Sequence, residues 1–171
     1  QSGNGNHFQQ TTATKMPLYE YELSDNGKPC LSFDGKNDFM SCVNDGISSG
    51  GNGIAHDHTI FFVSKVVNTS DSQQQGYIIS KNTETDNSNK FLIHARVTSS
   101  GFVLNVAYVD DDNNAATAAG TNVLGDVVVY AVKFHNKTFQ VFRNGTQTFS
   151  DTEPFYDTFD FYPAKPLVIG A

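Results

Sequence analysis

The sequence of 171 residues has no tryptophan, two cysteines, 11 lysines and arginines, and no apolar run near the roughly 20 residues of a membrane-spanning helix. Its 18 acidic residues give a formal net charge of −7. Nucleic-acid affinity comes largely from Lys and Arg neutralising phosphates, so a nucleic-acid partner is not expected. We also expect no insertion into a membrane.

Helical periodicity is absent as well. The apolar residues alternate with a period of two, and Gly, Asn and Asp bound the runs, which is typical of strands. This pattern predicts strands over residues 28–34, 38–43, 58–67, 76–82, 90–97, 101–109, 126–136, 137–143, 146–150 and 167–170. Residues 44–57, 68–75, 110–121 and 151–165 are expected to be loops. Many short strands without helices predict an all-β fold, a two-sheet antiparallel sandwich.

Two local signals complete this outline. The pair Asn144-Gly145 lies between two predicted strands and indicates a tight hairpin, because both central residues of such a turn need positive φ. Residues 1–27 are polar, with a few apolar anchors, and are expected to form an arm packed across the domain. Residues 28–171 are expected to form one sandwich.

Three phrases in order carry a family resemblance: "SGNGNHFQQTTATKMPLY", "NGKPCLSFDGKNDFM" and "HTIFFVSKV". Together with "KFHNKTFQVFRNGTQTF", they resemble the laminin G-like branch of the concanavalin A-like lectin and glucanase superfamily. The resemblance implies a jelly-roll sandwich. Domains of this branch usually continue after a phrase like "LVIGA" into a closing strand, so we expect this sandwich to lack that strand and to be a piece of a longer protein.

The resemblance leaves several functions open, because the superfamily includes lectins, adhesion modules, virion and tail proteins, and hydrolases. Its hydrolases place acidic residues at alternate positions of one strand, and no predicted strand here has that pattern. We therefore expect a non-catalytic recognition or adhesion module, located outside a cell, at the cell surface or on a virion. The expected partner is a glycan or cell-surface polysaccharide. The alternative is a structural part of a phage tail, fibre or capsid surface, with self-association or contacts to neighbouring chains, and a glycoside hydrolase comes third.

Two groups of acidic residues are candidate calcium ligands, because calcium prefers six to eight oxygen ligands and several relatives implied by the resemblance bind it. Asp34 and Asp38 bracket "GKN", and the simpler interpretation is a turn in which Asp accepts backbone N–H bonds. The run at 110–114 offers more oxygens, for calcium through Asp110 and Asp112 or for sugar hydroxyls. The simpler interpretation there is a solvated acidic loop. The candidate ligand-binding residues of this run are Asp110, Asp111, Asp112, Asn113 and Asn114.

Aromatic side chains are the usual platform for sugar rings. The segment "EPFYDTFDFYP" concentrates them, and Tyr156 is its candidate sugar contact, although such a loop can equally cover the core or dock a subunit. His56 and His58 alternate and can share a metal ion, but zinc is not the favoured interpretation.

The two cysteines face each other if residues 28–34 and 38–43 form a hairpin centred on Lys36. A Cys30–Cys42 disulfide is then conceivable in an oxidising compartment, and two small buried side chains are the alternative. Three N-x-S/T sequons, at Asn68, Asn136 and Asn144, are weak signals, because turn conformation already explains two of these asparagines.

Overall fold

The computed structural model describes residues 7–21, 27–42, 58–67, 75–81, 90–98, 101–109, 115–122, 125–135, 138–151 and 166–170. The strands within these ranges are β1 (Leu18–Glu20), β2 (Cys30–Ser32), β3 (Met40–Cys42), β4 (His58–Lys65), β5 (Gln75–Lys81), β6 (Lys90–Thr98), β7 (Gly101–Val109), β8 (Ala115–Asn122), β9 (Val127–His135), β10 (Thr138–Arg143), β11 (Thr146–Asp151) and β12 (Leu167–Ile169). A 3₁₀ turn spans Ala13–Lys15. Across these ranges, no helix is long and apolar enough to cross a bilayer.

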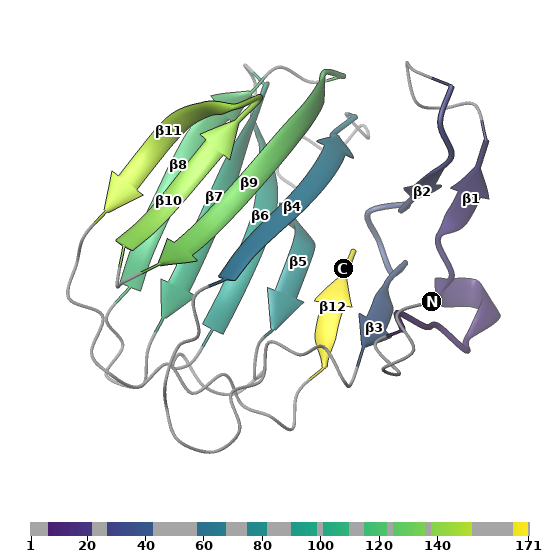
Figure 1. The fold of residues 1–171 in the computed structure, drawn as a ribbon. Helices are drawn as coiled ribbons and strands as arrows, with labels where there is room; N and C mark the ends of the chain where they lie inside the picture. The colour runs from purple at the N-terminus through teal and green to yellow at the C-terminus, as the bar shows by residue number, and fades with distance from the viewer. Residues whose placement is uncertain are drawn as a thin grey trace.

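The strands form two large antiparallel sheets and a short ribbon (Figure 1). The six-stranded sheet has the order β3-β12-β5-β6-β7-β8, and the four-stranded sheet has the order β11-β10-β9-β4. The β1 and β2 strands pair only with each other among the described strands, and this two-stranded ribbon stands to one side of the sheets. The predicted all-β, two-sheet antiparallel sandwich is confirmed.

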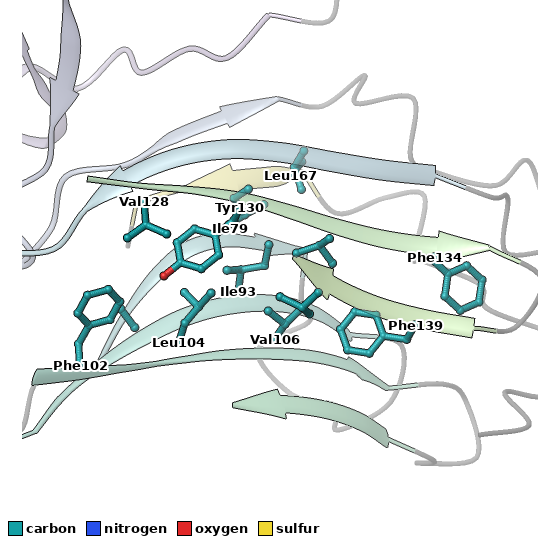
Figure 2. Close-up of a cluster of buried hydrophobic side chains, with 13 residues drawn as sticks. Ile79, Ile93, Phe102, Leu104, Val106, Val128, Tyr130, Phe134, Phe139 and Leu167 are labelled. Carbon is teal, nitrogen blue, oxygen red and sulfur yellow. The ribbon is translucent and has the colours of Figure 1, made fainter. Parts of the chain in front are cut away.

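The core lies between the two sheets, and Figure 2 shows its side chains meeting there. Burial alternates along β9, where Val128, Tyr130 and Val132 are buried while Val129 is exposed. Phe62 of β4 stacks on Tyr130 with ring centroids 5.0 Å apart. The buried cluster consists of Ile79, Ile93, Ala95, Phe102, Leu104, Val106, Val128, Tyr130, Val132, Phe134, Phe139, Val141 and Leu167. Period-two alternation therefore places one face of each main strand inside, as the sequence predicts.

The Asn144-Gly145 hairpin is confirmed. Asn144 has φ 48° and Gly145 has φ 82°, and these two residues connect β10 to β11. The Asn144 N–H donates to the carbonyl of Val129 (2.8 Å), and the Asn144 Oδ1 accepts from the Val129 N–H (3.0 Å). Positive φ at both residues produces a turn whose twist matches the flanking strands.

The segment before β1 also contacts the sandwich. Gln9 forms an isolated antiparallel bridge with Ser41, and Phe8 packs against the core. The carbonyl of Lys15 accepts the N–H of Phe39 (3.1 Å). The division of the chain into an arm over residues 1–27 and a domain over 28–171 stays a prediction.

Two sequence-based expectations are wrong. The runs at 28–34 and 38–43 do not pair as a hairpin, because β2 pairs with β1 and β3 pairs with β12. Phe33 leaves the ribbon and lies against Gly170 after β12, so the chain passes from the ribbon to the six-stranded sheet. The expected loop at 110–121 contains most of β8, which pairs with β7 along its whole length although its sequence "AATAAGTN" has little strand propensity.

Candidate functional site

Asp34 and Asp38 close a turn. The Asp34 Oδ1 accepts the backbone N–H groups of Lys36 (2.9 Å), Asn37 (3.1 Å) and Asp38 (3.3 Å). The Asp38 Oδ2 accepts the N–H of Asp34 (3.1 Å). The N–H groups, that of Lys36 first, hold the pKa of Asp34 below its ordinary value of 3.8.

This geometry fits a calcium site poorly. Backbone donors already use one oxygen of each carboxylate, and calcium requires six to eight oxygens. No group of three or more His, Cys, Asp or Glu residues gathers in the described part of the chain. The arrangement at Asp34 and Asp38 therefore supports the turn interpretation.

The other candidate ligand-binding residues lie outside the described part of the chain: Asp110, Asp111, Asp112, Asn113, Asn114, Tyr156 and His56. A calcium ion at Asp110 and Asp112, and sugar contacts in these two loops, stay predictions. His58 is described and stacks on Phe134, with ring centroids 5.8 Å apart.

The two cysteines are free thiols, with Cys42 buried and Cys30 partly buried. The Cys30–Cys42 disulfide was one of two alternatives, and it depended on a hairpin that does not form. Cys30 lies opposite Glu20 in the ribbon, whereas Cys42 lies opposite Leu167 in the six-stranded sheet.

The exposed apolar side chains divide into three surfaces. Ten large apolar residues are exposed within the described ranges: Met16, Leu18, Tyr19, Tyr21, Leu31, Phe61, Val63, Val67, Tyr77 and Val129. Leu18, Tyr19 and Leu31 belong to the ribbon, and Met16 and Tyr21 lie close to the two ends of β1. Four belong to β4, β9 or the residues just after β4. Tyr77 is the tenth, and it lies on β5 in the other large sheet.

Tyr77 belongs to a row of three side chains across the six-stranded sheet. The strand register places Tyr77 opposite His94, and His94 opposite Asn105. The neighbours of His94 and Asn105 along β6 and β7 are buried residues of the core. Alternation therefore puts His94 and Asn105 on the outer face. We call these three residues the Tyr77 row.

The side chains of the Tyr77 row touch one another. The rings of Tyr77 and His94 meet edge to face, with centroids 6.0 Å apart and planes at 83°. The amide Nδ2 of Asn105 lies 2.8 Å from the Nε2 of His94. An amide nitrogen can only donate, so Nε2 accepts and the neutral ring carries its proton on Nδ1.

Burial lowers the pKa of His94 below its ordinary value of 6.5, which keeps the ring neutral near pH 7. The row then combines an aromatic face, a phenolic hydroxyl, an imidazole N–H donor and an amide oxygen acceptor. Sugars present apolar C–H faces beside hydroxyls that both donate and accept hydrogen bonds. The row can therefore bind a sugar through both kinds of contact.

The outer face of the four-stranded sheet is different in character. Ala131 lies opposite Phe61 on one side and Phe142 on the other, so a small residue separates two phenyl rings. A depression of about 390 Å³ forms there, and Phe61 is 74 % exposed. We call this depression the Phe61 groove, which is lined by Thr59, Phe61, Val129, Ala131, Lys133, Phe142 and Gly145.

Sequence reasoning missed both the Tyr77 row and the Phe61 groove. His94 and Asn105 were inside predicted strands, and each is flanked by apolar residues, but alternation alone does not say which strands are neighbours. Phe61 lies in "HTIFFVSK", where Phe62 points inward, so both faces of β4 are apolar. An apolar outward face on a predicted strand was the available signal for the Phe61 groove.

No protein-family profile and no curated protein sequence matches the chain. Solved structures do match. The full-length tailspike protein 2 of Escherichia coli O157:H7 bacteriophage CAB120 is 17% identical with a TM-score of 0.60, over 96% of this chain and 22% of that chain. The CBM40 module of a Ruminococcus gnavus IT-sialidase, bound to α2,3-sialyllactose, is 19% identical with a TM-score of 0.50, over 66% of this chain and 62% of that chain. A leech intramolecular trans-sialidase is 16% identical with a TM-score of 0.52, over 70% of this chain and 19% of that chain.

The chain thus spans about three fifths of the Ruminococcus module and about a fifth of the tailspike. Likeness at this level of identity shows the fold, which is a two-sheet antiparallel β-sandwich of the jelly-roll type.

Proposed function

We propose that this chain is a non-catalytic carbohydrate-binding module of the laminin G-like type, and that the Tyr77 row contacts the sugar. The observation that carries the proposal is the alignment of an exposed tyrosine, a neutral histidine and an asparagine on three neighbouring strands. Strands hold such side chains in fixed positions, which suits a site that must match the spacing of sugar hydroxyls. The shared fold with a sialyllactose-bound module agrees with this function.

The proposed module binds a sugar and does not break a bond in it. Retaining glycosidases place two carboxyl groups about 5 Å apart across the bond that they break. The Tyr77 row contains no carboxylate, so it can bind a sugar without acid or base catalysis. The proposed location is extracellular, at the cell surface or on a virion, which is what the resemblance to laminin G-like domains implies.

Binding of the purified chain to a glycan array, followed by calorimetry on the best ligand, tests the proposal. We expect Tyr77→Ala and Asn105→Ala each to weaken binding about ten-fold, because each removes a ring contact or a hydrogen-bonding amide. Gln147→Ala on the other sheet is the matched amide control and leaves binding within about two-fold. A blank array, wild-type affinity in both row variants, or hydrolysis of a bound glycan would each contradict the proposal.

The pH dependence of binding gives a separate prediction. Protonated His94 can no longer accept a hydrogen bond from the Asn105 amide N–H. The affinity for the sugar therefore falls as pH drops from about 7.5 through the lowered pKa of His94. The measurement is calorimetry across that range. In His94→Gln the side chain stays neutral and this pH dependence disappears. An affinity independent of pH in the wild type would argue against a role for His94 in binding.

A further inference from the structure

The β5 strand contains an extra residue next to the Tyr77 row. Ile79 lies opposite Ile93 of β6, and the register then passes over Ile78 to Tyr77, which lies opposite His94. Two residues of β5 therefore occupy the place of one, which is a β-bulge. Bulges are common next to active sites, where they change the direction in which a side chain points.

The bulge determines which face of the sheet Tyr77 occupies. Ile79 is buried in the core, so strict alternation from Ile79 would point Ile78 outward and Tyr77 inward. The structure has the reverse arrangement, because Ile78 packs against the core cluster and Tyr77 is 40 % exposed. Two consecutive isoleucines thus pack on the core, and the extra residue brings Tyr77 to the outer face.

A competing register is available to the same residues. Without the bulge, Ile78 would lie opposite His94, and Tyr77 would lie opposite Ala95, which is buried. A shift of one residue exchanges the two faces of a strand. Among the described strands, β12 pairs with β5 only beyond the bulge, so residues 75–77 pair with β6 alone. Only one ladder of hydrogen bonds has to rearrange for the shift to occur.

Two contacts of Ile78 favour the observed register. Its side chain packs against the core, which removes apolar surface from water. Its carbonyl accepts the N–H of Gly170 (3.1 Å), so the bulge is also bonded on the β12 side. The competing register would expose the Ile78 side chain, and it would bury a tyrosine hydroxyl that then needs a hydrogen-bond partner.

We propose that Ile78 is a positioning residue of the Tyr77 row, because its inward packing holds the bulge that places Tyr77 on the outer face opposite His94. The consequence for sugar affinity rests on the carbohydrate-binding function proposed above. The placement of Tyr77 does not rest on it, because that placement is a property of the free chain. Ile78 acts through Tyr77 and makes no contact with the sugar itself.

Nuclear Overhauser contacts between the rings of Tyr77 and His94, measured without sugar, report the register directly. Ile78→Asn places a polar side chain at the inward position, so the competing register becomes populated. We expect loss of the ring contact and about the same ten-fold loss of sugar affinity as in Tyr77→Ala. Ile78→Val keeps a branched apolar side chain and retains both. Thermal unfolding verifies that the variants are folded, and Ile78→Thr is the milder replacement if Ile78→Asn is not.

Deletion of Ile78 separates a positioning role from a merely structural one. Removing one isoleucine from "GYIISK" leaves a strand that alternates regularly, with Tyr77 opposite His94 and Ile79 opposite Ile93 without a bulge. The shortened strand has no competing register of this kind. We therefore expect it to keep the ring contact, with sugar affinity within about two-fold of the wild type. If Ile78 only filled the core, its deletion would be at least as harmful as Ile78→Asn.

The ring contact and the sugar affinity distinguish the two proposals. A ring contact that persists in both folded polar variants, or that is lost in the shortened chain, overturns the positioning role of Ile78. A shortened chain that does not fold also overturns it, because Ile78 would then be needed for the core itself. If the ring contact changes as expected but the sugar affinity does not follow it, the carbohydrate-binding function fails and the positioning of Tyr77 by Ile78 stands.

Discussion

Asp34 shows how one side chain fixes a local conformation. Its Oδ1 accepts three backbone N–H groups, and Asp38 closes the same turn from the other end. Those bonds are strongest to the ionised carboxylate, so they lower the pKa of Asp34. The folded-state pKa therefore lies below the unfolded value, and ionisation of Asp34 stabilises the folded chain above that pH range.

We expect Asp34→Ala to lower the urea midpoint at neutral pH, because three N–H groups lose their acceptor. The difference from wild type shrinks as pH falls below 3.8 through the pKa of Asp34, since a protonated carboxyl is a weaker acceptor. Asp34→Asn keeps a neutral oxygen acceptor and is the control, with a smaller loss at neutral pH that shrinks over the same range, because only the wild-type carboxyl titrates. Equal losses for Asp34→Ala at neutral and acid pH would contradict this account.

Sequence patterns predicted the residues of that turn and missed those of the Tyr77 row. The bonds of Asp34 reach residues two to four positions away, so a local motif contains the whole arrangement. Tyr77, His94 and Asn105 meet only because β5, β6 and β7 are neighbours in a particular register. No local pattern specifies that register.

At the scale of elements, the passage from ribbon to sheet depends on a close approach between Phe33 and Gly170. Gly170 follows β12 with φ 66°, and its N–H donates to the carbonyl of Ile78 (3.1 Å). A Cβ at this position would overlap the ring of Phe33. The Phe33 ring therefore packs directly on the backbone, and this contact joins the segment after β2 to the end of β12.

We expect Gly170→Ala to destabilise the fold more than Gly35→Ala, by about 1–3 kcal/mol in urea denaturation. Both glycines have similar positive φ, at 66° and 69°, so the conformational cost of about 1–2 kcal/mol is common to both. Gly35 has nothing within 4 Å of an added Cβ, whereas Gly170 meets Phe33. Equal losses at the two positions would show that Phe33 moves aside freely.

Strand pairing explains the elements that the sequence did not predict. The β8 strand is rich in Ala, Thr, Gly and Asn, without an alternating apolar pattern, and pairs with all but one residue of β7. The β2 and β3 strands have three residues each, too few to specify their partners by pattern. In both cases the partner strand supplies the hydrogen bonds and decides the outcome.

At the scale of the whole molecule, the two sheets are held together by one layer of alternating side chains. Phe139 of β10 is fully buried in that layer, and its ring lies 5.7 Å from that of Phe149 between centroids. Phe61 of β4 lies in the same sheet but points outward and is 74 % exposed. The same residue type therefore serves the interior at one position and a surface at the other.

We expect Phe139→Ala to reduce the free energy of unfolding by about 3–5 kcal/mol, because it leaves a cavity between the sheets. Phe61→Ala changes it by less than about 0.5 kcal/mol, since its ring is already in solvent. Urea denaturation of both variants measures the difference. A large loss in Phe61→Ala would show that its ring packs within the folded chain, and it would remove the basis for a free Phe61 groove.

The sequence by itself determined the all-β class, most strand positions, the Asn144-Gly145 hairpin and the Asp34 turn, because period-two burial and turn chemistry act over a few residues. Only the tertiary structure decided the partners of β2 and β3, the strand at β8, the separation of the two cysteines, and the two outer surfaces. Each of these depends on which distant strands lie side by side and in what register. That choice is made by packing the two sheets over a shared core.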